Sequence, residues 1–197
     1  MELMDSNAIK LAKELRSILE ERHIRLVLAE SCTAGRVAAT LAVLPGISQW
    51  LCGSLVVYRS SSKRAWLDVP AELLDDPAVG PVSAAVTELL ACSALARTPE
   101  ADWAIAVTGD VGPGAPTASD GCVFMSSARR RSSGDKAQDD STSAQQVRLT
   151  APTPRDANDL TARETRLDEA TRHVLQFALQ QILSTSAGEM GPHRAAN

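Results

Sequence analysis

Hydrophobic positions along the chain alternate between the three-to-four-residue spacing of amphipathic helices and the short apolar runs of buried strands. The first helix is expected to begin at Asp5 or Ser6, because apolar residues recur at helical spacing from Ile9 to Leu19. Further helices are expected over residues 36–44, from Ser60 to before Pro70, over residues 84–96 and from Asp159 onward. Strands are expected over residues 24–29, 53–58, 103–107, 122–126 and 146–149.

This order of elements predicts an α/β fold, with one layered α/β/α domain over residues 1–184 and a mixed, largely parallel sheet. Residues 129–144 are polar and poor in apolar side chains, so we expect a mobile loop there. Residues 185–197 continue no helical pattern and are expected to form a disordered tail.

Sheets of this kind bind ligands at the carboxyl ends of their strands, which points to the loops after Ala29, Tyr58 and Val107. The first loop reads Ala-Glu-Ser-Cys-Thr-Ala-Gly over residues 29–35 and predicts a strand-to-helix turn. Backbone N–H groups near Ser31 in such a turn suit an oxyanion or a phosphate. Taken alone, however, this loop favours a helix N-cap as the explanation of Ser31.

The other two loops add candidate chemistry. Tyr58 is the only tyrosine and Lys63 follows five residues later, so a phenol and an amine are available to remove a serine proton if their pKa values are lowered. Taken alone, these two residues are better explained as a rim tyrosine and a solvated lysine. Thr108 and the glycines that follow it form either a tight surface turn or a cradle of backbone amides. Three such loops at three strand ends together favour a functional site.

Composition removes several classes of function. The 197 residues are 44% hydrophobic, which suits a globular domain, but only 3% aromatic, and the net charge is −4. A nucleic-acid-binding module is therefore excluded, because it needs basic and aromatic surface. The four cysteines show no C-x-x-C spacing, so no metal site is expected. No leader and no membrane-length apolar run is evident, so we expect a cytoplasmic protein without membrane contact.

The turn at residues 29–35 resembles the Ala-Glu-Ser-Cys-Thr-Gly-Gly signature of the CinA C-terminal domain, the nicotinamide-nucleotide amidohydrolase family. The resemblance continues in order over residues 8–127 and, more weakly, over residues 160–184. The further segments similar to family motifs are Pro45-Gly46-Ile47-Ser48, Gly53 to Tyr58 with Lys63 downstream, Val82-Ser83, and Val107-Thr108-Gly109 with Gly112-Pro113. The ordered set is specific, although no single piece of it is.

The resemblance implies hydrolysis of the carboxamide of nicotinamide mononucleotide, a small-molecule pyridine nucleotide, to nicotinate mononucleotide and ammonia in NAD salvage. It implies no cofactor and a homo-oligomer. The catalytic residues it implies are Ser31, Tyr58, Lys63 and Thr108. The substrate-binding residues it implies are Glu30, Thr33, Gly35, Gly109, Gly112 and Arg166. Ser31 would attack the carboxamide and form an acyl-enzyme, or only bind the substrate while water attacks. Arg166 would meet the phosphate or be a surface arginine of its helix.

Several positions depart from the family pattern. Ala34 and Ser54 stand where the family has glycines, and Arg59 stands where it has serine. Asp110 replaces an apolar residue near the expected phosphate site, and the segment after Gly114 lacks the family's continuation. Two functions therefore stay open. One is an active amidohydrolase, and the other is a family member that binds a nucleotide or a protein partner without turnover.

Overall fold

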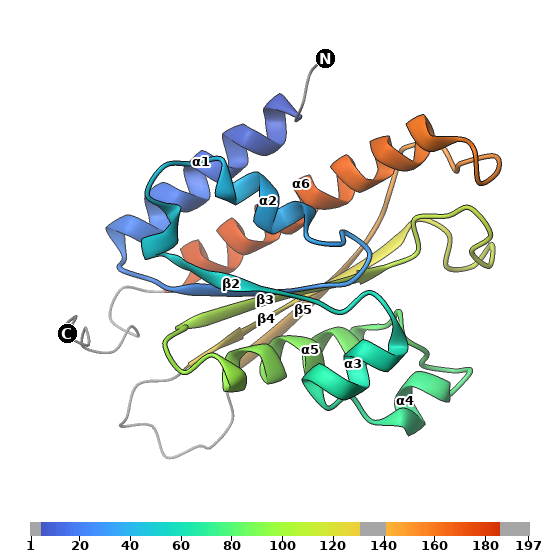
Figure 1. Ribbon diagram of the computed structural model, residues 1–197, viewed down its shortest axis with the longest axis horizontal. Coiled ribbons are helices and arrows are strands. Elements are labelled where there is room, and N and C mark those ends of the chain that lie inside the picture. Colours follow the sequence, from blue (N-terminus) through green and yellow to red (C-terminus); the bar gives the residue numbers. More distant parts are fainter. Residues whose placement is uncertain (1–4, 131–140, 186–197) are drawn as a thin grey trace.

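A five-stranded sheet forms the centre of the computed structural model, which describes residues 5–130 and 141–185 (Figure 1). The strands are β1 (Leu26–Glu30), β2 (Leu51–Val56), β3 (Trp103–Gly109), β4 (Cys122–Arg129) and β5 (Ser141–Arg148). The helices are α1 (Ser6–Glu21), α2 (Arg36–Ala42), the 3-10 helix η1 (Ile47–Gln49), α3 (Ser60–Leu67), α4 (Ala71–Asp75), α5 (Ala84–Arg97) and α6 (Leu160–Ser184).

The strand order is β2-β1-β3-β4-β5, and the sheet is mixed as predicted. β1 pairs in parallel with β2 on one side and with β3 on the other. β4 pairs antiparallel with both β3 and β5. Parallel pairing is therefore confined to the half of the sheet that carries the first three strands, and this half supplies the loops singled out above.

Alternate side chains of the central strands enter two separate hydrophobic cores, because successive residues of a strand face opposite sides of the sheet. Leu26 and Leu28 of β1 pack in the core beneath α1, α2 and α6. Val27 and Ala29 pack in the core beneath α3 and α5. Figure 1 shows the same division, with α1, α2 and α6 covering one face of the sheet and α3, α4 and α5 covering the other. The predicted α/β/α layering is confirmed.

The carboxyl ends of the three parallel strands meet in register. Glu30, the last residue of β1, lies opposite Val56 of β2 and Val107 of β3. The loops that follow these strands therefore start at the same edge of the sheet, as the sequence predicted. β2 ends earlier than expected, so Tyr58 lies two residues beyond the strand instead of at its last position.

The expected loop over residues 129–144 is wrong at both of its ends, since β4 runs to Arg129 and β5 begins at Ser141. β5 is an edge strand whose side chains are mostly exposed, so its sequence carries no apolar alternation, and pairing with β4 supplies its hydrogen bonds. Residues 131–140, the centre of that loop, lie outside the described residues, as do residues 186–197 of the expected tail.

The longest helix, α6, has 25 residues and carries charged side chains along its length. Within residues 5–130 and 141–185, no helix is both long enough and apolar enough to cross a bilayer.

Candidate active site

Ser31 is held by backbone hydrogen bonds in the turn between β1 and α2. Its amide donates to the Val107 carbonyl at 3.1 Å, and its carbonyl accepts from the Ala34 amide at 3.0 Å. The side chain is 5% exposed. The helix-cap explanation of Ser31 is wrong, because the N-cap residue of α2 is Gly35 and no cap-residue side chain bonds the helix.

The carboxylate of Glu30 caps α2 instead. It is 1% exposed and accepts five hydrogen bonds of 2.8–3.1 Å. The donors are the hydroxyls of Thr33 and Ser54 and the amides of Gly35, Val37 and Ala38. A negative charge at this position also offsets the positive end of the helix dipole. Two residues expected to bind substrate, Thr33 and Gly35, are thus bonded to a third, Glu30, and the three shape the turn that presents Ser31.

Lys63 of α3 reaches Ser31 across the end of the sheet. Its Nζ atom lies 3.0 Å from Ser31 Oγ, and the side chain is 2% exposed. Burial lowers the pKa of the Lys63 amine below its ordinary value, although the carboxylate of Asp110 acts in the opposite direction. A buried amine with a lowered pKa, in contact with a hydroxyl, has the arrangement of a general base beside a nucleophile.

Cys32 is buried beside this pair, but its thiol is unreactive. Burial raises the pKa of its thiol to about 12, so it is protonated near neutral pH and is not a nucleophile. Its sulfur packs against Gly109 at the end of β3, where an added Cβ would lie 3.0 Å from Sγ and 3.0 Å from the Cys122 carbonyl. A side chain larger than that of glycine would not fit at position 109, because the turn that contains Cys32 packs directly on β3.

Thr108 is fully buried, and its hydroxyl lies 2.8 Å from the hydroxyl of Thr87 on α5. The Thr87 hydroxyl donates its single hydrogen to the Ser83 carbonyl at 2.6 Å. Thr108 must therefore be the donor in the pair of threonines. The Thr108 side chain ties β3 to α5, and only its lone pairs are left to face a ligand.

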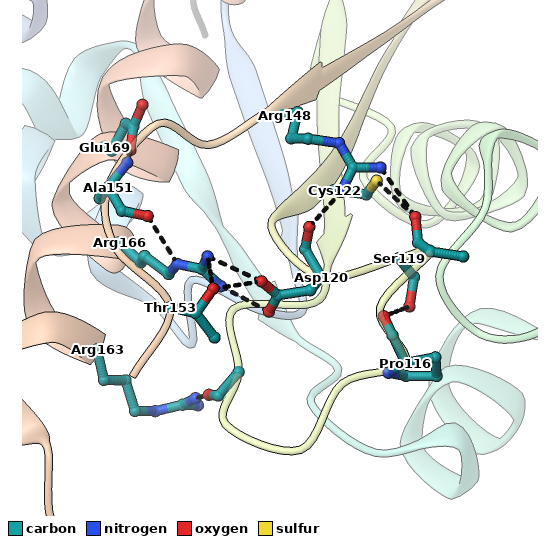
Figure 2. Close-up of polar contacts among 12 residues, drawn as sticks. Pro116, Ser119, Asp120, Cys122, Arg148, Ala151, Thr153, Arg163, Arg166 and Glu169 are labelled. Carbon is teal, nitrogen blue, oxygen red and sulfur yellow. Dashed lines mark hydrogen bonds and ion pairs between the residues drawn. The ribbon is translucent and has the colours of Figure 1, made fainter. Parts of the chain in front are cut away.

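Arg166 of α6 is turned toward the loop between β3 and β4 (Figure 2). Its guanidinium makes two bonds to the Asp120 carboxylate, at 2.7 and 2.9 Å, and further bonds to Thr153 and Ala151. Arg166 is 3% exposed. The hydrogen bonds from Arg166 hold the pKa of Asp120 below its ordinary value. This pairing therefore contributes stability at neutral pH, which is lost as the pH falls through the lowered pKa.

Arg163, one helical turn before Arg166, was missed by reasoning from the sequence. It donates to the Gly112 carbonyl and, at 3.0 Å, to the hydroxyl of Tyr58. Tyr58 is 52% exposed, and Arg163 rather than Ser31 is the hydrogen-bond partner of its hydroxyl. The spacing of two arginines three residues apart on one helix face was the available signal.

The structure thus brings Ser31 and Lys63 into contact. Tyr58 and Gly112 form a second group with Arg163, and Arg166 belongs to the loop contacts. Among residues 5–130 and 141–185, no cluster of three or more His, Cys, Asp or Glu side chains is arranged to hold a metal ion.

Comparison with known proteins agrees with this architecture. The family model for the CinA C-terminal domain matches residues 8–153. A CinA-like protein of Desulfotalea psychrophila is 41% identical over 99 residues, which are 50% of this chain and 23% of that protein. A CinA-like protein of Synechococcus sp. is 35% identical over 117 residues, covering 58% of this chain and 27% of that protein. The chain spans about a quarter of the length of these curated relatives.

Solved structures cover far more of the chain. The competence damage-inducible protein A (ComA) of Klebsiella pneumoniae has a TM-score of 0.75 and 27% identity, over 92% of this chain and 100% of that one. The competence/damage inducible protein CihA of Agrobacterium tumefaciens has a TM-score of 0.73 and 28% identity, again over 92% and 100%. Sequence motifs, fold and family model coincide on the same residues, and the chain belongs to the CinA C-terminal domain family.

Proposed function

We propose that the chain is an amidohydrolase that converts nicotinamide mononucleotide to nicotinate mononucleotide and ammonia. One observation carries the proposal, namely the buried contact of 3.0 Å between Lys63 Nζ and Ser31 Oγ at the carboxyl ends of the parallel strands. The named relatives are described only as CinA-like, so the pyridine nucleotide comes from the family resemblance of the motifs. The hydrolytic chemistry comes from the pair itself.

In the proposed reaction, neutral Lys63 takes the proton of the Ser31 hydroxyl as its oxygen attacks the carboxamide carbon. The tetrahedral intermediate then collapses, its C–N bond breaks, and the proton on Lys63 passes to the nitrogen, which leaves as ammonia. The resulting ester of Ser31 is hydrolysed by a water molecule that Lys63 deprotonates as its oxygen attacks the ester carbon. The C–Oγ bond then breaks, the proton on Lys63 returns to the Ser31 oxygen, and nicotinate mononucleotide leaves. Atoms balance with water as the only co-reactant, and the lowered pKa of Lys63 increases the share of neutral amine at any given pH.

The surrounding residues have supporting roles in this proposal. Backbone amides that follow Ser31 in the turn would stabilise the oxyanion. Arg163 and Tyr58 lie at the more exposed rim and would meet the phosphate, whereas Arg166 is already occupied by Asp120. Glu30 is assigned to shaping the turn, since its carboxylate is fully used by α2 and its neighbours.

The experiment measures ammonia release from nicotinamide mononucleotide. We expect turnover by the unmodified chain and a loss of several orders of magnitude in Ser31→Ala and in Lys63→Met, which keeps the length of the side chain but removes the amine. The matched control is Ser61→Ala, an exposed serine of α3, which should keep full activity.

Two results would count against the proposal. Near-normal turnover by Ser31→Ala would remove Ser31 as the nucleophile. If the unmodified chain releases no ammonia while nicotinate mononucleotide still raises its Tm, the chain is a binding protein of the same family instead.

A further inference from the structure

Three arginines from two other elements hold the loop of residues 110–121, which joins β3 to β4 beside the Ser31–Lys63 pair. Arg148 of β5 donates to the carbonyls of Asp120 and Ala118 at 2.6 and 2.8 Å. Arg163 and Arg166 approach from α6 (Figure 2). This is the segment in which the sequence departs from the family pattern after Gly114.

The pair of Asp120 and Arg166 is the buried part of this arrangement. Their side chains are 19% and 4% exposed, and the two oxygens of the carboxylate face two nitrogens of the guanidinium. Thr153 closes a triangle, since its hydroxyl donates to Asp120 at 2.6 Å and accepts from Arg166 at 2.7 Å. Bidentate, charge-assisted contacts of this kind fix both distance and orientation.

Gly112 rests directly on this pair. A Cβ added to Gly112 would lie 3.2 Å from Asp120 Oδ1 and 3.4 Å from Arg166 Nη1. The carbonyl of Gly112 accepts a hydrogen bond from Arg163, whose guanidinium also donates to the Tyr58 hydroxyl. The ion pair therefore supports the group of residues that forms the rim of the site.

The pair also supports the start of the loop, next to the reacting groups. The Gly121 amide, beside Asp120, donates to the Asp110 carbonyl at 2.8 Å. The Asp110 amide donates to the Cys122 carbonyl at 2.9 Å. Asp110 follows Gly109, which packs on Cys32 of the Ser31 turn.

We propose that Asp120 and Arg166 form a positioning clamp, which holds the Asp110–Gly112 backbone and the Arg163–Tyr58 contact at the distance from Ser31 that the reaction needs. The inference rests on the proposed function, because the clamp serves that reaction. Neither residue is a catalytic residue in this account. Arg166 makes four hydrogen bonds inside the protein, so it acts through the loop and not on the phosphate.

The test compares Asp120→Asn, Arg166→Gln and the double variant by kcat, KM and hydrogen exchange. A clamp predicts a fall in kcat of roughly tenfold to a hundredfold, because small displacements of a positioned group slow the chemical step. KM should rise as well, because the Arg163–Tyr58 contact that would meet the phosphate is loosened. The double variant should be no slower than the slower single variant, since either change opens the same clamp. Backbone amides of residues 109–121 should exchange faster in all three.

The matched control is Arg172→Gln, which breaks an ion pair that the same helix makes with Asp5, a residue outside the loop. It should leave kcat and the exchange of residues 109–121 unchanged. Asp120→Asn keeps one acceptor for Arg166 and is the variant to rely on if Arg166→Gln does not fold.

A merely structural ion pair would lower Tm in these variants without lowering kcat, and that result would overturn the clamp. Additive losses of kcat in the double variant would also overturn it. If the unmodified chain releases no ammonia, the proposed function fails separately. The clamp is then decided by exchange of residues 109–121 and by the Tm shift with nicotinate mononucleotide, and unchanged values for both in Asp120→Asn would refute it.

Discussion

Ala34 occupies a backbone conformation that suits glycine. Its φ is +51°, in the left-handed region, and it precedes Gly35 at φ +93° in the turn that presents Ser31. The departure from the Gly-Gly signature therefore leaves the turn formed and places a strained alanine in it. A left-handed conformation of a residue with a Cβ costs about 1–2 kcal/mol.

Replacing Ala34 with glycine should accordingly stabilise the protein by about 0.5–1 kcal/mol, after allowing for the greater freedom of glycine in the unfolded chain. The measurement is the urea midpoint at constant m-value. Ala39→Gly is the control, because Ala39 is exposed in the interior of α2 and its replacement should destabilise by about 1 kcal/mol. Equal losses in the two variants would contradict the strain at Ala34.

Individual residues differed in how far the sequence could place them. Ser31 and Lys63 were predictable as neighbours, because each follows the end of a strand and parallel strands bring their ends together. The sequence could not distinguish the roles of Arg163 and Arg166, because both lie on one face of a helix and only the packing of α6 decides which one is buried. The Asp120–Arg166 pair joins residues 46 positions apart, and no local pattern encodes it.

At the scale of elements, the junction of β1 and α2 depends on one carboxylate. Glu30 is the last residue of β1, yet its side chain satisfies the amides of the next helix and the Ser54 hydroxyl of β2. Ser54 stands where the family has a glycine, so this chain adds a donor to the junction. The strand, the turn and the helix are therefore one unit around a buried charge.

Glu30→Gln should destabilise the protein by about 2–3 kcal/mol, because the amide group places N–H donors against backbone N–H donors and loses the interaction with the helix dipole. Chemical denaturation checks the value. The control is Glu164→Gln, whose exposed ion pair with Arg36 is worth less than about 1 kcal/mol. A loss from Glu30→Gln no larger than the control would show that the buried carboxylate is not needed as a charge.

Elements with a local signal were predicted closely, whereas those that tertiary pairing stabilises were not. α1 begins at Ser6 and α5 covers Ala84–Arg97, both near the expected bounds, because amphipathic spacing and a side-chain cap are local features. β5 was predicted only at its end, over residues 146–148, because the rest is a polar edge strand whose formation depends on β4 and not on its own apolar residues.

At the scale of the molecule, the site joins both layers of helices across the end of the sheet. Ser31 comes from the turn after β1, Lys63 from α3 on one face, and Arg163 from α6 on the other. The burial that lowers the pKa of Lys63 is thus a property of the assembled layers. Between the lowered pKa and the ordinary one, the unfolded chain holds a proton that the folded chain has released, so this group makes the free energy of unfolding rise with pH.

The same pKa governs the proposed reaction, since only the neutral amine accepts the Ser31 proton, and kcat/KM should rise with pH through it. The titratable groups that act on Lys63 are the Cys32 thiol, from the turn, and the Asp110 carboxylate, from the loop. Cys32 stays neutral in this range because its pKa is about 12.

Asp110 raises the pKa of Lys63, so Asp110→Asn should move the rise of kcat/KM to lower pH, by a few tenths to about one pH unit. Glu14→Gln makes the same change in net charge on an exposed face of α1 and should leave the profile in place. Two outcomes would contradict this prediction: coincident profiles for the two variants, or a shift of the Asp110→Asn profile to higher pH. Either would show that the effect of Asp110 on the Lys63 pKa does not set the pH dependence of kcat/KM.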